Sequence, residues 1–309
     1  MTRRQLDGVL LLDKPVGLGS NAALQAAKRL YRAEKAGHAG TLDPLASGLL
    51  PVLFGEATKF SQLVLDADKE YWARAQLGVT TRTGDAEGEV LERRPVRVEP
   101  QSIEAALAAF RGEIAQVPPM YSALKHRGRP LYVLARRGES IERAPRRVRV
   151  HVLELLGMTQ DTLELRVRCS KGTYVRTLVE DIGRALGCGA HLASLRRVAA
   201  SGFRIEQAVT LDQLQQVDEA GRDRLLLPLD RLLEGLPRLE LSEVEAERFA
   251  KGQAIPFPQA QAGRYRVYRE QGGLLGVAEA GRDGALQPQR LLATRPQAAQ
   301  AADKHQKNL

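Results

Sequence analysis

One carboxylate in this sequence is a candidate for chemistry because glycines and apolar residues surround it. Asp43 lies in the segment Gly-His-Ala-Gly-Thr-Leu-Asp-Pro-Leu-Ala-Ser-Gly-Leu-Leu, residues 37–50. An Asp-Pro pair is common turn chemistry, which alone would give Asp43 no reactive role. The apolar run over residues 49–53 instead anchors this carboxylate beside the core. There it can act as a nucleophile or a general base, provided that it stays ionised.

A cation is needed beside such a carboxylate, because burial disfavours the charged form. Arg176, which ends the run Lys-Gly-Thr-Tyr-Val-Arg at the start of the most strongly amphipathic segment of the chain, is one arginine that could supply this cation. The spacing also permits an exposed pair between Arg176 and Glu180, one helical turn apart. The residues alone leave both interpretations open.

Two other kinds of site have weaker support. Gly17-x-Gly19-x-x-Ala22 imitates the glycine fingerprint of dinucleotide-binding proteins. That fingerprint needs a second apolar strand soon after the helix, whereas residues 33–44 read as a loop. Metal-ligand spacing is absent among the five histidines, at positions 38, 126, 151, 191 and 305. We therefore expect no nucleotide cofactor and no metal.

The elements that must position these residues alternate between strand and helix patterns. Periodicity predicts, in order, a strand over 8–12, a helix over 20–30 capped at Ser20-Asn21, a helix over 56–65, a strand over 71–77, a polar loop over 80–88, a helix over 103–110 capped at Ser102, strands over 148–156 and 162–169, and a helix over 174–186. They follow no steady βαβ rhythm. We expect an α+β fold in which helices and loops flank a central mixed, mainly antiparallel sheet.

The character of the sequence changes after Phe203. Helical pieces over 211–217 and 222–233 are followed by a compact stretch with a helix over 243–249 and strand-like runs over 265–268 and 274–278. We therefore expect a large N-terminal domain over residues 1–235 and a small β-rich domain over residues 236–296. The polar remainder, residues 297–309, is expected to be disordered.

The charge of the chain favours a polyanionic partner. Its 309 residues carry a formal net charge of +9, with a sequence pI near 9.7. Residues 125–149 hold nine Lys or Arg against two acids, which is a net +7. Arg dominates this segment and suits forked phosphate contacts. A solvated basic surface is the alternative, but nucleic acid fits the composition better.

The cysteines and the N-terminus point to a cytoplasmic protein. Cys169 and Cys188 lie far apart and form neither a disulfide framework nor a metal-ligand pattern. The first apolar run, residues 9–12, stops at Asp13 and is too short for a signal peptide or a membrane span.

Several motifs in this chain, taken in order, resemble the TruB family of tRNA pseudouridine-55 synthases. Besides the Asp43 segment they are Gly8-Val-Leu-Leu-Leu-Asp-Lys-Pro, Gly55-Glu-Ala-Thr-Lys, Asp68-Lys-Glu-Tyr, Gly84-Asp-Ala-Glu-Gly, Gln116-Val-Pro-Pro-Met-Tyr-Ser-Ala-Leu-Lys and Lys171-Gly-Thr-Tyr-Val-Arg-Thr-Leu. The resemblance implies an isomerase that breaks the uracil N1–C1′ bond, turns the base and rejoins it to the ribose through C5. Asp43 would attack C1′ or remove a C2′ proton, and the sequence does not choose between these.

The resemblance also assigns the other site residues. Arg176 would pair with Asp43, and Tyr71 would stack on the flipped uracil and is a candidate general base at C5. It gives His38 a place in the T-loop, and it gives Tyr174 and Leu195 contacts around the flipped uracil, although Leu195 could equally be a core residue. Apart from the resemblance, Lys14 and Lys59 lie near these motifs and would be phosphate-facing or structural. Arg146, Arg147 and Arg149 of the basic segment are further candidate RNA contacts. Asp85, in the polar loop, would help order the site or simply form an Asx turn.

The domain organisation that the resemblance implies agrees with the large N-terminal and small β-rich C-terminal domains expected above. The small C-terminal domain would be PUA-like and would add grip on tRNA, while the arginine-rich segment near 120–150 would be an insert that clamps the T-arm. No metal or cofactor is implied. A monomer that needs no protein partner would act on the tRNA T-arm, and the same surface would let it serve as a tRNA chaperone.

Overall fold

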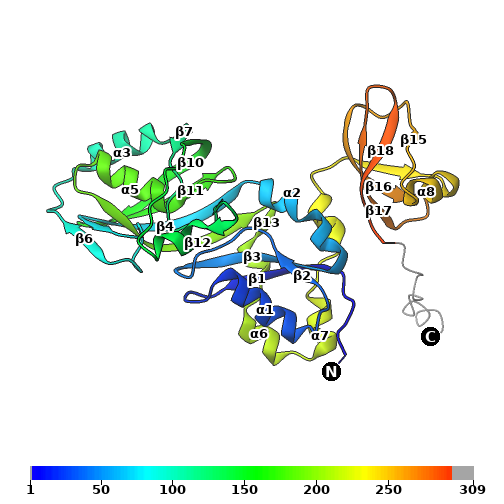
Figure 1. Cartoon of the computed structure of the whole chain (residues 1–309), viewed down its shortest axis with the longest axis horizontal. Coiled ribbons are helices and arrows are strands. Elements are labelled where there is room, and N and C mark those ends of the chain that lie inside the picture. The colour runs from blue at the N-terminus through cyan, green and yellow to red at the C-terminus, as the bar shows by residue number, and fades with distance from the viewer. Residues whose placement is uncertain (1, 294–309) are drawn as a thin grey trace, which may run out of the picture. The chain divides into compact units, whose positions relative to one another are not determined.

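The computed structural model describes residues 2–293 and divides into two compact units. The first ends at Pro228 and the second begins at Leu229. Each is described by itself, with the element labels of Figure 1. The predicted tail, residues 297–309, lies outside the described residues.

A nine-stranded sheet forms the centre of the first unit. Its main path runs β1-β3-β12-β4-β11-β10-β7, with β2 beside β3 and β13 beside β12. The strands are β1 (Gly8–Lys14), β2 (Ala36–His38), β3 (Ala46–Phe54), β4 (Lys69–Leu77), β7 (Gly112–Gln116), β10 (Arg146–Met158), β11 (Thr162–Cys169), β12 (Ala190–Ala200) and β13 (Phe203–Arg204). All neighbours are antiparallel except β3 and β12, which run parallel. The predicted mixed, mainly antiparallel sheet is confirmed.

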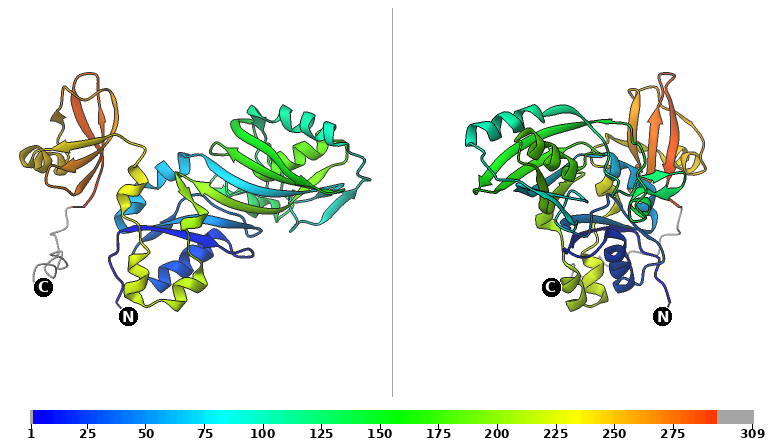
Figure 2. Two further views of the ribbon diagram at one scale, coloured as in Figure 1. Left: turned by 180° about the vertical axis from the view of Figure 1, so that it is seen from behind. Right: turned by 60° about the vertical axis from the view of Figure 1, so that its left-hand side comes forward.

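Helices cover the two ends of this sheet (Figure 2). They are α1 (Ser20–Leu30), α2 (Ser61–Asp66), α3 (Pro100–Ala109), α4 (Leu131–Ala135), α5 (Val175–Ala185), α6 (Leu211–Gln216) and α7 (Glu219–Arg224), with 3-10 turns η1 (Gly55–Phe60) and η2 (Ile205–Gln207). One core lies between α3, α5 and the β4, β10 and β11 strands. A second core joins α1 to β1 and β3. Two hairpins, β5 (Val79–Thr81) with β6 (Val90–Arg93) and β8 (Lys125–His126) with β9 (Arg129–Pro130), complete the unit.

Alternation along β4 divides its side chains between core and solvent, as period-two patterning requires. Tyr71 is 9% exposed and belongs to the core with α5, whereas Trp72 next to it is 51% exposed. The face that carries Tyr71 is therefore the face that α5 covers.

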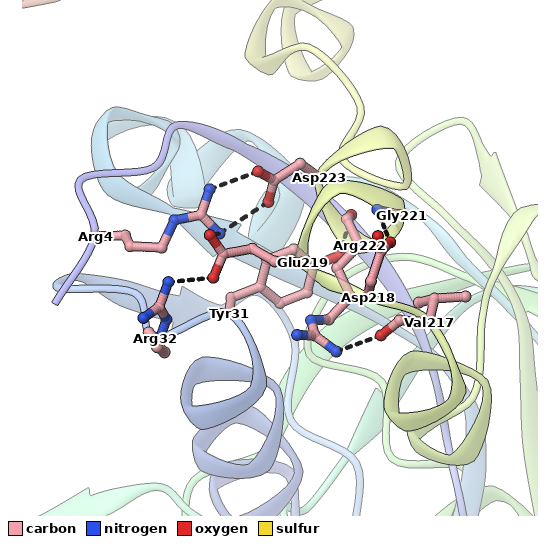
Figure 3. A network of polar contacts seen from close by, with 9 residues as sticks. All are labelled: Arg4, Tyr31, Arg32, Val217, Asp218, Glu219, Gly221, Arg222 and Asp223. Atoms are coloured by element: carbon pink, nitrogen blue, oxygen red, sulfur yellow. Dashed lines mark hydrogen bonds and ion pairs between the residues drawn. The ribbon is translucent and has the colours of Figure 1, made fainter. Parts of the chain in front are cut away.

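The N-terminal arm is fastened to α1 and α7 by a polar network (Figure 3). Arg4 donates to both carboxylate oxygens of Asp223, and Arg32 is paired with Glu219. The Tyr31 hydroxyl donates to the Arg222 carbonyl at 2.7 Å. This network holds the end of α1 in place, and α1 in turn supports the Asp43 segment.

The second unit is a small five-stranded sheet with one helix. After η3 (Leu229–Leu233) come β14 (Arg238–Leu241), α8 (Glu243–Ala250), β15 (Ile255–Pro256), β16 (Gly263–Arg269), β17 (Leu274–Ala280) and β18 (Ala285–Leu291). The sheet order is β14-β16-β17-β18-β15. Apolar residues of the strands and α8 share one core. A small β-rich C-terminal domain is confirmed, although β14, β15 and β18 were not predicted.

Four local expectations differ from the structure. Residues 36–38 form the short strand β2 where a loop was expected. The N-cap of α1 is Gly19, and that of α3 is Glu99 followed by Pro100, so neither Ser20 nor Ser102 caps a helix. A helix was expected over 56–65, but η1 occupies its first half. The dinucleotide alternative is wrong because β1 and β3 pair antiparallel, whereas that motif needs parallel strands.

Candidate active site

The Asp43 loop, residues 39–45 between β2 and β3, is fastened to α1. The Ser20 hydroxyl accepts from the Leu42 N–H at 2.7 Å and donates to the Leu42 carbonyl at 2.9 Å. The Gly17 N–H donates to the Pro44 carbonyl at 2.8 Å. Because Asp43 stands between Leu42 and Pro44, these bonds fix its backbone on both sides.

Arg176 lies in the first turn of α5 and is 5% exposed. Its Nη2 is 2.8 Å from Asp43 Oδ2, and its Nη1 is 3.4 Å from Asp85 Oδ2. The guanidinium also donates to the Thr83 carbonyl at 3.0 Å and the Tyr121 carbonyl at 2.6 Å. An exposed pair with Glu180 is excluded by this burial.

The charge state of Asp43 reflects opposing effects. Desolvation raises the pKa of Asp43, and the Arg176 guanidinium opposes that rise, while the neighbouring Asp85 adds to it. The side chain of Asp43 nevertheless keeps 42% of its surface exposed. The carboxylate is thus held at an opening by a cation that is itself enclosed.

Asp85 forms an Asx turn with one carboxylate oxygen and faces the active-site arginine with the other. Its Oδ1 accepts from the Glu87 N–H at 3.2 Å and from the Thr83 hydroxyl, which is an Asx-turn arrangement. The other oxygen, Oδ2, faces Arg176. At 3% exposure, Asp85 is buried with the guanidinium.

Tyr71 and Leu195 come from neighbouring strands on the same face of the sheet. In the β4–β12 register, Leu195 lies opposite Ala73, and Arg197 lies opposite Tyr71. Leu195 also lies opposite Ala46, just after the Asp43 loop. Burial raises the pKa of Tyr71, and the neighbouring Arg197 guanidinium opposes that rise.

Tyr174 is the N-cap residue of α5 and is held by the end of β7. The Gln116 side chain accepts from the Tyr174 N–H at 3.0 Å and donates to the Tyr174 carbonyl at 3.3 Å. Burial raises the pKa of Tyr174, and the neighbouring Ser122 side chain opposes that rise. Residues 117–145, which connect β7 to β10, therefore touch both Tyr174 and, through the Tyr121 carbonyl, Arg176.

His38 ends β2 and is partly buried. Its Nδ1 is buried without a hydrogen-bond partner among the described residues. Desolvation, reinforced by Arg197, lowers the pKa of His38. A neutral imidazole five residues from Asp43 follows from this environment.

Lys14 differs from its prediction as an RNA contact. It is fully buried, and its Nζ donates to the Pro15 carbonyl at 2.7 Å and to the Leu18 carbonyl at 2.6 Å. Burial lowers the pKa of Lys14 to about 8. This lysine supports the turn between β1 and α1 and does not face a phosphate.

The remaining basic residues lie at the surface. Lys59 pairs with Glu56 on η1 at 2.7 Å. Along β10, Arg147 pairs with Glu113 at 2.7 Å, and Arg149 approaches the same carboxylate at 3.9 Å. Arg146 points to the other face by alternation, and its charge acts on Tyr174.

Sequence reasoning missed Ser20, Gln116 and Arg197. Ser20 was taken for a helix cap, although its hydroxyl binds a backbone 22 residues away. Arg197 follows Arg196 in a strand, and only the strand register decides which of the two is buried. An apolar residue on each side of the pair, Leu195 and Val198, was the available signal.

No group of three or more His, Cys, Asp or Glu within residues 2–293 is arranged to hold a metal ion. In the same range, no helix has the length and apolarity needed to cross a membrane. What the site offers is a partly exposed carboxylate that is paired with a buried guanidinium and whose charge acts on Tyr71. Such a set can attack an electrophilic carbon or remove a proton next to a flat ring.

Comparison with known sequences identifies the family. Residues 28–175 match the TruB family pseudouridylate synthase N-terminal domain. Residues 176–234 match the tRNA pseudouridylate synthase B C-terminal domain, and residues 237–292 match the C-terminal domain of pseudouridine synthase II TruB. The tRNA pseudouridine synthase B of Dechloromonas aromatica is 55% identical over 94% of this chain and 96% of its own. That of Burkholderia lata is 57% identical over 94% and 92%.

Solved structures agree. A crystal structure of a Cbf5-Nop10-Gar1 complex contains a chain 28% identical to this one, with a TM-score of 0.70 over 92% of this chain and 84% of that one. An archaeal box H/ACA Nop10-Cbf5 complex gives a TM-score of 0.70 at 27% identity, over 93% and 86%. The matched domains, the identity along nearly the whole length and the shared fold together show that this chain belongs to the TruB family of pseudouridylate synthases, which are isomerases.

Proposed function

We propose that this chain converts uridine 55 in the T-loop of tRNA to pseudouridine in the cytoplasm. The observation that carries the proposal is the ion pair between buried Arg176 and partly exposed Asp43, whose charge acts on Tyr71. The name of its relatives, tRNA pseudouridine synthase B, supports the choice of tRNA as substrate. The net charge of +9 suits such a polyanion.

The reaction asks for a base that has left its stack. Tyr71 offers an aromatic face on which a flipped uracil can lie at little conformational cost. Leu195, one strand away on the same face, would close the other side of the base. Tyr174, at the start of α5, would border the same space.

Asp43 then acts at the sugar while the N1–C1′ bond breaks. Either its oxygen bonds C1′, or it removes the C2′ proton to give a glycal, and in both cases N1 leaves with the bonding electrons. The base turns and C5 bonds C1′. In the first route this breaks the bond between the Asp43 oxygen and C1′, and in the second route the proton returns to C2′. The C5 proton then leaves to a base, and N1 gains a proton. Atoms balance without an external reagent, so the step is an isomerisation. Tyr71 is our candidate for the group that accepts the C5 proton.

Release of the C5 hydrogen tests the enzyme proposal. The protein is mixed with tRNA that carries tritium at uracil C5, and tritium is measured in the water. We expect release from the unmodified protein and none from Asp43→Asn, which should still bind tRNA. Absence of release from the unmodified protein contradicts the proposal.

The RNA must also be opened for its base to be reached. We propose that His38 enters the T-loop, as a neutral ring, and that the basic segment of residues 125–149 holds the T-arm. A single chain is expected to suffice, because one T-arm needs one such site. The second unit would add grip on the rest of the tRNA.

The same contacts support a chaperone role. A protein that opens and releases the T-loop allows a misfolded tRNA to refold, whether or not a base is modified. Asp43→Asn separates the two activities, since it should still speed the refolding of a misfolded tRNA. If that variant binds tRNA and leaves the refolding rate at its protein-free value, the chaperone proposal fails.

A further inference from the structure

Arg197 of β12 is one of the largest fully buried side chains of the protein, with 1% of its surface exposed. Within residues 2–293 it makes no ion pair with a carboxylate. Burying a charge is costly when no opposite charge accompanies it. The hydrogen bonds of this guanidinium must therefore offset the free-energy cost of its burial.

Those bonds reach the start of the Asp43 loop and β3, the strand that follows the loop. Arg197 Nε donates to the Leu49 carbonyl at 2.7 Å, and Nη2 donates to the Gly40 carbonyl at 2.9 Å. Gly40 and Leu49 flank Asp43 in sequence. One rigid planar group therefore fixes the position of Gly40, in the loop, relative to Leu49 of β3.

The same guanidinium lies near the hydroxyl of Tyr71, because Tyr71 and Arg197 are direct partners in the β4–β12 register. Each of the two groups acts on the pKa of the other. The loop and β3 are both packed closely against this arginine. A Cβ added at Gly40 would lie 3.1 Å from Arg197 Nη1, and one added at Gly48 of β3 would lie 2.3 Å from the Arg197 carbonyl oxygen. Little space remains for the loop to shift relative to Tyr71.

We infer that Arg197 is a positioning residue that holds the Tyr71 hydroxyl and the Asp43 loop in one fixed arrangement. The inference rests on the proposed function, because it concerns the geometry of Asp43 and Tyr71 around the uridine. Arg197 acts through these two residues and does not itself touch the substrate. Displacements of about 1 Å in such a site cost roughly 100-fold in rate.

Two substitutions separate charge from geometry. Arg197→Lys keeps the charge but replaces the planar fork with a single ammonium, which cannot span both carbonyls and the hydroxyl. Arg197→Met removes the charge and fills similar volume, so it avoids burying an unpaired cation and should fold. Arg196→Lys is the matched control: this neighbour faces away from Tyr71 and pairs with Asp13 at 2.7 Å.

The rate of tritium release under single-turnover conditions is the readout, with tRNA binding and thermal unfolding measured alongside. We expect a rate about 10- to 100-fold below that of the unmodified protein for both Arg197 variants, while tRNA affinity changes less than about 3-fold. Arg196→Lys should react at the unmodified rate. A folded Arg197 variant that reacts as fast as the unmodified protein overturns the inference, whereas lack of release from the unmodified protein overturns the proposed function first.

A double-mutant cycle tests whether Arg197 acts through Tyr71. Tyr71→Phe keeps the ring and removes the hydroxyl. If the inference holds, Arg197→Lys lowers the rate by a smaller factor in the Tyr71→Phe background than in the unmodified protein. Equal factors in the two backgrounds contradict the link to Tyr71. The cycle also distinguishes the inference from a purely structural role of Arg197, because a general loosening of the fold would lower the rate by the same factor in both backgrounds.

Discussion

Arg176 and Asp43 meet through Nη2 and Oδ2 at 2.8 Å, yet one side chain is enclosed and the other is open. The arginine is bound by two backbone carbonyls and a second carboxylate besides Asp43. Its position is therefore set by the protein whether or not Asp43 is engaged. Asp43 can turn its charge to a substrate while its counterion stays in place.

Replacement of this arginine tests that division of roles. Arg176→Lys should lower the rate of C5 tritium release about 100-fold at neutral pH, because a lysine cannot bind Asp43, Asp85 and two carbonyls at once. Arg184→Lys, on the exposed side of the same helix and paired with Asp181, should leave the rate unchanged. A rate within about 3-fold of the unmodified one for Arg176→Lys would show that the forked geometry is dispensable.

Asp43 should cost the protein some stability at neutral pH. Desolvation raises its pKa above the ordinary value of 3.8, so the folded state holds the proton more tightly than the unfolded state does. The associated stability is then present below pH 3.8 and is lost as the pH rises through the higher folded pKa.

Asp43→Asn should therefore unfold at a temperature equal to or above that of the unmodified protein at pH 7. Because the side chain is partly exposed, we expect a gain below about 1 kcal/mol. The difference should vanish as the pH falls through the titration of the carboxyl. Calorimetric unfolding at several pH values measures it, and a clearly less stable variant at pH 7 would contradict the predicted sign.

Gly48 and Gly17 both have positive φ, of 102° and 82°, but different surroundings. A Cβ at Gly48 would lie 2.3 Å from the Arg197 carbonyl oxygen, whereas one at Gly17 has nothing within 4 Å. We expect Gly17→Ala to cost about 1 kcal/mol, from backbone strain alone. Gly48→Ala should cost about 3 kcal/mol or more, since β3 and β12 must separate. Denaturant unfolding compares them, and equal losses would mean that the close strand approach is relaxed at little cost.

Arginines of β10 are divided between two faces, and their effects on RNA binding should differ. Arg146 lies on the side of Tyr174, whereas Arg147 already pairs with Glu113. Arg146→Gln should reduce the slope of log affinity for tRNA against log salt by about 1. Arg147→Gln should change it less. Equal slopes for the two variants would show that the face of the strand does not decide which arginine meets a phosphate.

Local pattern was sufficient for much of the fold. The alternation over residues 71–77 predicts that Tyr71 and Trp72 point to opposite faces, and their exposures agree. The amphipathic repeat of α5 was equally informative, because a stripe of apolar residues must face a core. The Asp43 segment was found from its motif. Where side chains act within one element, the sequence carries the signal.

Contacts between distant segments could not be predicted from the sequence in the same way. The Ser20 hydroxyl could cap its own helix or bind Leu42, and nothing local decides between them. Lys14 reads as a surface cation, but its ammonium satisfies two carbonyls of the turn beside it. The burial of Arg197 depends on the β4–β12 register. A shift of that register by one residue would bury Arg196 instead.

The parallel pairing of β3 with β12 has a consequence for how the protein matures during synthesis. Arg197 is 148 residues beyond Leu49, whose carbonyl it binds. While the ribosome is still making the intervening chain, the Asp43 loop has neither this arginine nor its strand neighbour. Pairing of such high sequence separation forms late. For most of its translation, a nascent chain therefore carries Asp43 without the β12 residues that complete the site. The site can form only once residues near 200 have left the exit tunnel.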